Sequence, residues 1–189
     1  MDNGAGNYRR FLDGDDTGIV DIIKEYKDGL ILFLNRYVCS IHIAEELAED
    51  TFVVLATRKP RFSPKYSFKT WLYTIGRNAA VNYLKQSSRI SAVSSDELEK
   101  TLRDESDLEQ DYLKEERKII IHRSLSKING DYSKVLYLKF FEEMTNAQIA
   151  KIMKKSVRQT ENLIYQAKKA LKTELNKEGL NYENLYRNG

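Results

Sequence analysis

The 189-residue chain has few of the residues that interrupt helices or cross-link chains. It contains two prolines, Pro60 and Pro64, one cysteine, Cys39, and two histidines. A single cysteine excludes an intramolecular disulfide, and nothing indicates an oxidising compartment. With so few prolines the chain can be helical almost throughout, with one loop at residues 59–67. The sequence has no apolar run long enough for a membrane span and no apolar core for a signal peptide, so we expect a cytoplasmic protein without membrane insertion.

Residues that bind metals or act as nucleophiles are also scarce. His42 and His122 are far apart and have no Cys or carboxylate at ligand spacing, so we predict no metal site and no cofactor. Cys39 lies in an apolar context, and we interpret it as a small core residue. Gly76 stands alone in a helical pattern without the companions of a phosphate loop, which indicates close helix packing. These observations argue against an enzyme.

Charge is distributed unevenly along the chain. Residues 52–95 contain no Asp or Glu, although the whole chain has 28, and the same stretch carries eight cations. These cations are Arg58, Lys59, Arg61, Lys65, Lys69, Arg77, Lys85 and Arg89. Residues 96–111 hold eight acids against two cations, and residues 144–177 hold eight cations against two acids. The formal net charge of +3 therefore averages two positive segments and a negative one, which indicates a polyanionic partner.

Hydrophobic periodicity predicts an all-α protein. Apolar residues recur at spacings of three and four in residues 17–37, 44–58 and 68–86, whereas the alternation typical of strands is not evident. The periodicity is lost in the Ser- and acid-rich residues 90–111 and then returns. We therefore predict two small helical domains joined by a flexible acidic linker. The predicted bounds are 8–89 for the first domain, 90–111 for the linker, 112–176 for the second domain and 177–189 for the tail.

Two capping boxes predict a helix-turn-helix in residues 144–171. Thr145 is followed three residues later by Gln148, and Ser156 by Gln159. The two helix starts lie eleven residues apart, which leaves a helix of about two turns, a tight connection and a second helix. The predicted buried stripe of the second helix is Val157, Thr160, Ile164, Ala167 and Leu171. Its outward stripe carries Arg, Gln and Asn, which can make bidentate contacts to base edges in a major groove. The alternative is an ordinary α-hairpin with a solvated basic face.

Two segments resemble a known family. "AEELAEDTFVVLATRKPRFSPKYSFKTWLYTIGRNAAVNYLKQSSR", residues 44–89, resembles region 2 of the extracytoplasmic-function (ECF) sigma factors of bacterial RNA polymerase. "LSKINGDYSKVLYLKFFEEMTNAQIAKIMKKSVRQTENLIYQAKKAL", residues 125–171, resembles their region 4. The two segments occur in the family's order, and the resemblance covers roughly residues 8–175. It implies a subunit that directs core RNA polymerase to promoters through −10 and −35 recognition and promoter melting.

The resemblance implies three binding surfaces. The first, on the helix of residues 44–58, would meet the clamp helices of the polymerase's largest subunit through Glu46, Glu49 and Asp50. The second would recognise the −10 element and hold a single strand; it comprises Arg61, Phe62, Lys65, Tyr66, Lys69, Tyr73, Arg77, Asn78 and Asn82. The third would read the −35 element; it comprises Lys154, Lys155, Arg158, Gln159, Asn162, Leu163, Gln166 and Lys169. The linker would thread polymerase channels otherwise used by RNA, and an anti-sigma factor is a further candidate partner.

Promoter melting accounts for the absence of acids in residues 52–95. A melted strand needs cations for its phosphates and flat apolar partners for its unstacked bases, whereas carboxylates would repel it. The predicted stacking partners are Phe62, Tyr66 and Tyr73, with Lys65, Lys69 and Arg77 on the backbone. Phe68 and Trp71 are expected to brace the loop from beneath.

The sequence departs from the family pattern in the helix-turn-helix. The family usually carries Gly where this chain has Lys154, so either the turn is less tight than in the family or Lys154 adopts a left-handed conformation at some cost. Lys155 stands in place of an apolar residue, and Leu163 and Glu161 stand in place of frequent cations. These departures concern the promoter sequence more than the fold.

Two other classes of protein are alternatives to a sigma factor. A helix-turn-helix regulator that acts without polymerase would explain residues 144–171 but not residues 52–95. A small nuclease or recombinase would need carboxylates for a metal or a nucleophile with a nearby base, and the basic region has neither. The sequence therefore favours a sigma factor.

Overall fold

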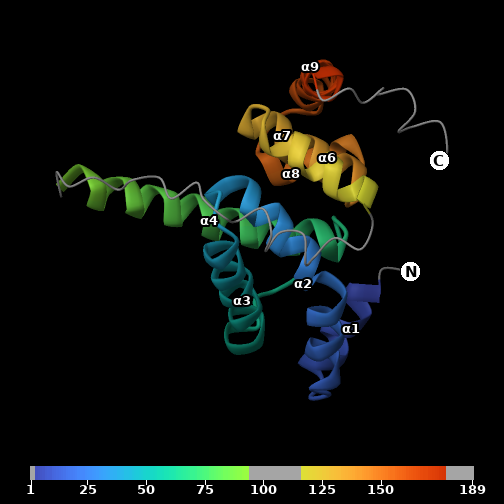
Figure 1. Ribbon diagram of the computed structural model, residues 1–189. Helices are drawn as coiled ribbons and strands as arrows, with labels where there is room; N and C mark the ends of the chain where they lie inside the picture. Colours follow the sequence, from blue (N-terminus) through green and yellow to red (C-terminus); the bar gives the residue numbers. More distant parts are fainter. Residues whose placement is uncertain (1–2, 94–115, 178–189) are drawn as a thin grey trace. The chain divides into compact units, whose positions relative to one another are not determined.

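The computed structural model describes residues 3–93 and 116–177, which form helices and no strand in those ranges (Figure 1). The chain divides into two compact units, residues 1–112 and 113–189. Unit 1 contains α1 (Asn3–Leu12), α2 (Thr17–Val38), α3 (Ile41–Arg58) and α4 (Phe68–Val93). Unit 2 contains α6 (Glu116–Ser126), α7 (Gly130–Phe140), α8 (Asn146–Met153) and α9 (Val157–Lys177). The predicted all-α class is confirmed.

In unit 1 the central element is α2, which packs against α1, α3 and α4. Its residues from Leu30 to Leu34 are all buried, so this helix is apolar around most of its circumference at that level. The loop between α3 and α4, residues 59–67, is the one long connection of the unit within its described residues. It joins the end of the helix predicted to meet polymerase to the start of the helix predicted to meet DNA.

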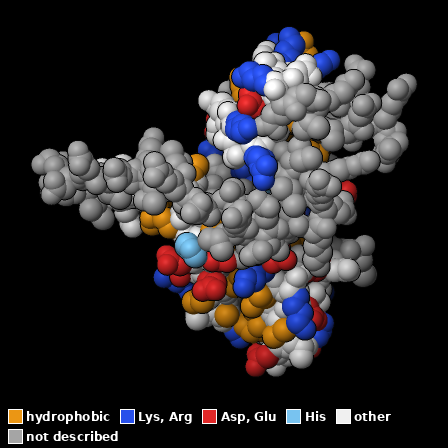
Figure 2. Space-filling view, in the orientation of Figure 1, with side chains coloured by type: hydrophobic (Ala, Val, Ile, Leu, Met, Phe, Trp, Pro, Cys, Tyr) orange, Lys and Arg blue, Asp and Glu red, His pale blue; other side chains and the backbone are white. Residues whose placement is uncertain are grey.

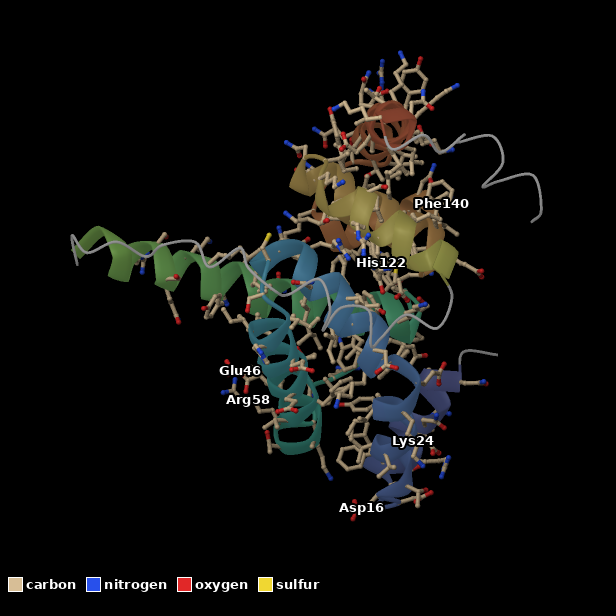
Figure 3. All side chains as sticks on the ribbon, viewed as in Figure 1. Asp16, Lys24, Glu46, Arg58, His122 and Phe140 are labelled. Atoms are coloured by element: carbon tan, nitrogen blue, oxygen red, sulfur yellow. The ribbon has the colours of Figure 1, made fainter. Side chains whose placement is uncertain are left out.

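In unit 2, α7 packs against α6, α8 and α9, and α9 also contacts α6 and α8. His122 of α6, labelled in Figure 3, is 1% exposed. Its ring meets those of Tyr137 and Phe141 edge-on, at centroid distances of 5.5 and 4.4 Å. Tyr137 and Phe141 are themselves stacked at 5.4 Å. His122 is thus a core residue of this unit.

The predicted helices agree with the observed ones to within a few residues at most ends. The helix predicted at residues 44–58 begins earlier because Ser40 caps α3, with its hydroxyl accepting from the Ile43 N–H at 3.5 Å. The helix predicted at residues 68–86 continues as α4 to Val93, which takes it into the predicted linker. The rest of that linker, and the tail after Lys177, lie outside the described residues.

The interpretation of Cys39 as a core residue is wrong. Cys39 is exposed and ends α2 in a left-handed conformation, with φ 51°, and its N–H donates to the Asn35 carbonyl at 2.9 Å.

The close packing predicted at Gly76 is confirmed, since a Cβ atom there would lie 2.9 Å from Leu30 Cδ1.

Candidate nucleic-acid and polymerase interfaces

The loop of residues 59–67 is held in place from its inner side. The Tyr8 hydroxyl of α1 donates to the Pro60 carbonyl at 2.8 Å, and burial raises the pKa of Tyr8, so the hydroxyl keeps its proton at neutral pH. The Phe62 ring lies 5.8 Å from Phe68 and 5.3 Å from Trp71. Tyr8 contacts both of the latter rings, at 5.6 and 5.3 Å. We call Tyr8, Phe62, Phe68 and Trp71 the aromatic brace; it fixes the first half of the loop.

The second half of the loop leads into a capped helix. The Ser67 hydroxyl accepts from the Thr70 N–H at 3.2 Å, which satisfies a backbone donor at the start of α4. Between the brace and this cap, Lys65 is exposed and Tyr66 is half-buried, with Lys65 Nζ 5.9 Å from the Tyr66 ring centroid. Lys65 and Tyr66 are therefore presented on a segment that is anchored at both ends.

The structure corrects one of the three predicted stacking partners. Tyr73 is 0% exposed, and its ring packs 5.3 Å from that of Phe33 in α2, so it is a core residue and cannot receive a base. Phe62 is half-buried in the aromatic brace, and Tyr66 is half-buried outside both the brace and the core. In the sequence, Lys69 and Arg77 lie four residues before and after Tyr73, which gave no indication that its ring is buried.

The other residues predicted for this surface extend from the loop along α4. Arg61 and Asn82 are exposed, whereas Lys69, Arg77 and Asn78 are half-buried. Arg77 donates from Nη1 to the Asn78 side-chain oxygen at 3.3 Å, which orients the guanidinium along the helix. Side chains four residues apart share one helix face, so the cations of α4 form a line that starts at the loop.

The predicted polymerase-binding residues share one face of α3. Glu46, Glu49 and Asp50 are all exposed, and Glu46 projects outward from the helix (Figure 3). Carboxylate side chains gather over this part of unit 1 in the space-filling view (Figure 2). Val53, one turn further along the same face, is 54% exposed. An apolar side chain beside three carboxylates is a mixed surface of the kind that protein interfaces use.

In unit 2 the turn between α8 and α9 takes the second of the two alternatives, a left-handed Lys154. Lys154 has φ 53° and ψ 45°, in the left-handed region that favours glycine. The Lys155 N–H donates to the Ala150 carbonyl at 3.0 Å and the Lys154 N–H to the Lys151 carbonyl at 3.4 Å. This pair of bonds is the Schellman motif, which satisfies carbonyls at the end of α8. The turn is therefore formed without glycine.

Both predicted capping boxes are present. The Gln148 side chain accepts from the Thr145 N–H at 2.8 Å and the Gln159 side chain from the Ser156 N–H at 2.8 Å. The N–H groups of Gln148 and Gln159 in turn donate to the Thr145 and Ser156 hydroxyls. Gln159 therefore has two roles to reconcile, since its amide oxygen already caps α9 and only its amide nitrogen remains to contact a base.

The buried stripe predicted for α9 is correct except at its first position. Thr160, Ile164, Ala167 and Leu171 are buried, whereas Val157 is 45% exposed because the helix starts there, before it reaches the core. On the opposite face the structure exposes the following predicted residues: Lys154, Arg158, Gln159, Asn162, Gln166 and Lys169. Leu163 and Lys155 are half-buried.

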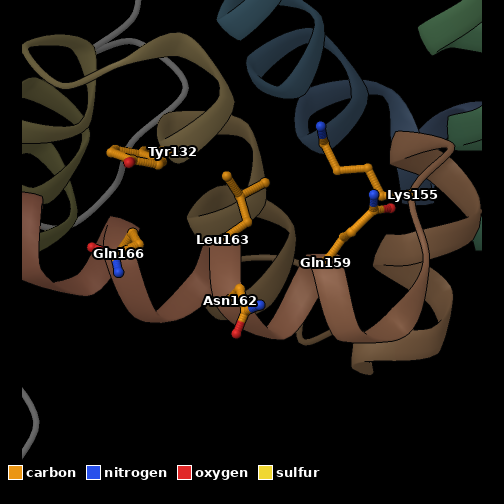
Figure 4. A pocket seen from close by; sticks show the side chains of 6 residues that line it. All are labelled: Tyr132, Lys155, Gln159, Asn162, Leu163 and Gln166. Atoms are coloured by element: carbon orange, nitrogen blue, oxygen red, sulfur yellow. The ribbon is translucent and has the colours of Figure 1, made fainter.

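A shallow cavity of about 310 Å³ lies on this face of unit 2 (Figure 4). Five of its lining residues are predicted site residues and the sixth, Tyr132, comes from the first turn of α7. The lining consists of Tyr132, Lys155, Gln159, Asn162, Leu163 and Gln166. In the close-up Leu163 points toward the Tyr132 side and Asn162 points away from it. The structure thus brings α7 to the edge of the predicted reading surface.

The Lys155 charge is partly balanced in unit 2. Lys155 Nζ lies 3.5 Å from an Asp131 carboxylate oxygen, and Lys134 Nζ lies 3.4 Å from the other. Among the residues that the structure describes, no carboxylate pairs with Lys154 or Lys169, and Lys169 Nζ lies 4.6 Å from the exposed Tyr165 ring. Exposed ion pairs are weak, so Lys155 can still turn toward a phosphate.

Four residues of these surfaces were missed in the sequence. Tyr8 belongs to α1, a short helix whose two buried aromatics, Tyr8 and Phe11, give too brief a pattern to recognise. Val53 was missed because the residue spacing along this helix does not report how far a single apolar side chain is exposed. Asp131 and Tyr132 follow an Asn129 cap, but only the packing of α7 on α9 brings them near the reading face. No sequence spacing reports that contact.

Two further observations concern other kinds of site. Among the described residues, no three His, Cys, Asp or Glu side chains come together as a group that could hold a metal ion. Within the same residues, no helix combines the length and apolar character needed to cross a membrane.

Comparison with protein families assigns both units. Residues 22–90 match Sigma-70 region 2, and residues 118–171 match Sigma-70, region 4. The first match contains α3, the loop and most of α4; the second contains α7, α8 and most of α9. The matches fall on the same helices that carry the three surfaces described above.

Individual relatives agree with this assignment. The chain is 26% identical over 160 residues to RNA polymerase sigma factor YlaC of Bacillus subtilis, which covers 84% of this chain and 92% of that protein. It is 22% identical over 170 residues to the ECF RNA polymerase sigma factor SigW of the same organism, covering 86% and 91%. A crystal structure of the sigma factor RpoE with the anti-sigma factor NepR from Bartonella quintana superposes with a TM-score of 0.62 at 17% identity, covering 82% and 97%.

The fold and both family matches define a transcription initiation factor with two helical DNA-binding units. The chain belongs to the sigma-70 family of RNA polymerase sigma factors, in the ECF group. Such a protein directs core RNA polymerase to promoters and starts transcription there. A helix-turn-helix regulator acting alone is not favoured, since it would lack region 2.

Proposed function

We propose that the loop of residues 59–67 captures the melted strand of the −10 element, and that Tyr66 is its main stacking residue. The observation that carries this assignment is the geometry of the loop. Its first half is fixed by the aromatic brace, while Lys65 and Tyr66 remain accessible on a stretch of chain without carboxylates. A preordered ring loses little conformational entropy when a base stacks on it. Arg61, Lys69 and Arg77 bind the strand's phosphates, and Asn78 and Asn82 extend the surface along α4.

The acidic face of α3 binds core polymerase in this proposal. Glu46, Glu49 and Asp50 meet basic side chains of the clamp helices of the largest subunit, and Val53 adds an apolar contact at the end of the patch nearer the loop. Because α3 leads directly into the loop, docking of this face would place the strand-capture surface next to the melted DNA. The region of the chain between α4 and α6 lies outside the described residues.

The exposed face of α9 reads the −35 element. Arg158 and Asn162 lie near the start of the helix, where a recognition helix contacts base edges. Gln159 contributes only its amide nitrogen, since its oxygen caps the helix. Lys154, Lys155 and Lys169 bind phosphates around this centre, and Leu163 and Gln166 complete the face.

Three further properties follow from membership of this group. We propose that the protein has no catalytic activity of its own and that polymerase supplies the chemistry. It acts in the cytoplasm, where bacterial core polymerase is found. An anti-sigma factor is its regulatory partner: the RpoE structure was determined with NepR, and another structure of the same fold, CnrH, was determined with the cytosolic domain of CnrY.

The strand-capture assignment is tested by two substitutions of one residue. Tyr66→Ala removes the ring, and we expect it to slow promoter opening by about 5- to 140-fold, since base–aromatic stacking contributes about 1–3 kcal/mol per base. Tyr66→Phe retains the ring and should open promoters at nearly the normal rate. Permanganate reactivity of unpaired thymines, with holoenzyme and a promoter mapped by transcription, measures opening directly. Equal opening by Tyr66→Ala and the unsubstituted protein would remove Tyr66 from the capture surface.

A further inference from the structure

The cavity on unit 2 combines two kinds of contact at neighbouring positions of α9. Leu163 and Tyr132 supply apolar surface, and Gln159, one turn before Leu163, supplies a polar group. Leu163 is half-buried, so part of its side chain remains open toward the cavity. The cavity is open to solvent and can take the edge of a base without enclosing it.

The hydrogen-bonding character of Gln159 is fixed by its cap. Its amide oxygen accepts from the Ser156 N–H at 2.8 Å, and its own N–H donates to the Ser156 hydroxyl at 3.1 Å. A backbone N–H can only donate, so the amide atom facing Ser156 must be the oxygen. The Gln159 oxygen, with one lone pair bound to the Ser156 N–H, is thereby turned toward the start of the helix, and the NH₂ group points away from the cap as a donor. A free Gln would offer both, as adenine recognition requires.

One base edge matches a donor next to an apolar surface. In the major groove thymine presents an O4 acceptor beside its C5-methyl group, whereas adenine and cytosine present amino donors at the corresponding place. Guanine presents acceptors but has no methyl group. We infer that the Leu163–Tyr132 notch, with the Gln159 amide nitrogen beside it, is a subsite for a thymine of the −35 element. This inference rests on the proposed role of α9 in −35 recognition.

The subsite also gives a role to a residue that departs from the family pattern. A cation at position 163 would seek an acceptor such as guanine O6 or a phosphate, whereas Leu163 can only offer apolar contact. Lys155 is drawn toward Asp131 at the rim of the cavity, which leaves the centre of the notch to Leu163 and Tyr132. The substitution of Leu for a cation therefore changes which base is preferred and does not merely remove a contact.

Deoxyuridine provides the direct test, because it pairs as thymine does and lacks only the methyl group. Holoenzyme selects duplexes from a pool randomised over the −35 and −10 elements, and the enriched duplex is the probe. Each −35 thymine is then replaced singly by deoxyuridine. We expect one replacement to weaken binding about fourfold, equivalent to about 0.8 kcal/mol at 1.4 kcal/mol per tenfold change. In Leu163→Ala this difference disappears, whereas Leu163→Met keeps it.

The control is Tyr165→Ala, which changes an exposed side chain of α9 outside the cavity and should leave the deoxyuridine effect unchanged. If every deoxyuridine duplex binds as well as its parent while Arg158→Ala still weakens the selected sequence, the thymine subsite is wrong and −35 reading by α9 stands. If the effect persists in Leu163→Ala, another residue contacts the methyl group and the assignment to Leu163 is wrong. If no −35 sequence is enriched at all, the proposed role of α9 in −35 recognition is itself wrong. If Leu163→Ala does not fold, the deoxyuridine comparison with the unsubstituted protein still tests whether the thymine subsite exists.

Discussion

At the scale of one residue, Gly→Ala substitutions at Gly76 and Gly6 separate the effect of core packing from the effect of helix propensity. A Cβ at Gly76 would lie 2.9 Å from Leu30 Cδ1, and Leu30 is 0% exposed, whereas a Cβ at Gly6 would meet nothing within 4 Å. Replacing a helical Gly by Ala gains about 0.5–1 kcal/mol, but overpacking a core costs about 1–3 kcal/mol. We expect Gly76→Ala to lower the free energy of unfolding and Gly6→Ala to raise it, as measured by urea denaturation. Stabilisation by both substitutions would contradict the packing of α4 on α2.

Tyr8 links the otherwise unassigned helix α1 to the strand-capture loop through one hydroxyl. Tyr8→Phe keeps the ring in the aromatic brace and removes the bond to the Pro60 carbonyl, which should cost about 1 kcal/mol of unfolding free energy. We also expect slower promoter opening, because the loop is then less fixed. Tyr165→Phe, which removes an exposed hydroxyl, is the control and should change neither quantity. Normal opening by Tyr8→Phe would mean that α1 stabilises the unit without positioning the loop.

At the scale of elements, Lys154 in the turn between α8 and α9 lowers the stability of unit 2 but supplies a positive charge. Lys154→Gly relieves a left-handed residue, φ 53°, and should stabilise unit 2 by about 0.5–1 kcal/mol. The same substitution removes a cation, so promoter affinity should fall and its salt slope should decrease by about 0.9 if Lys154 contacts a phosphate. Lys151→Gly, inside α8, should instead destabilise by about 1 kcal/mol. Thermal unfolding and binding titrations at several salt concentrations measure the two effects separately.

The elements with clear sequence patterns were predicted well. The ends of α8 and the start of α9 follow from two capping boxes, because a cap is a local interaction that four residues specify. The start of α2 at Thr17 and the end of α3 at Arg58 also agree with the pattern. Helix α1 was not recognised, since ten residues with three small ones among them carry too weak a periodicity.

The errors concern which side of an element faces the core. Tyr73 lies among cations in the sequence but is buried against Phe33, and Val157 fits the apolar stripe of α9 but precedes its contact with α7 and α8. These outcomes depend on contacts between helices, which spacing along one helix does not report.

At the scale of the whole molecule, the charge pattern assigns different partners to different parts of the chain. The acidic face of α3 suits a protein partner with basic helices, and the acid-free stretch of residues 52–95 suits a single strand. The cations of residues 144–177 suit duplex DNA. No single unit contains all three surfaces, so the proposed assignment predicts that promoter recognition needs the whole chain bound to polymerase.

The most direct test of this account is transcription in vitro with purified core RNA polymerase, followed by mapping of start sites on genomic DNA. The account predicts discrete start sites that appear only when the protein is added and disappear when either the −35 or the −10 element upstream of them is scrambled. It also predicts weak binding of the same promoters by the protein without polymerase. Tight, sequence-specific binding in the absence of core polymerase, with no new start sites in its presence, would contradict it.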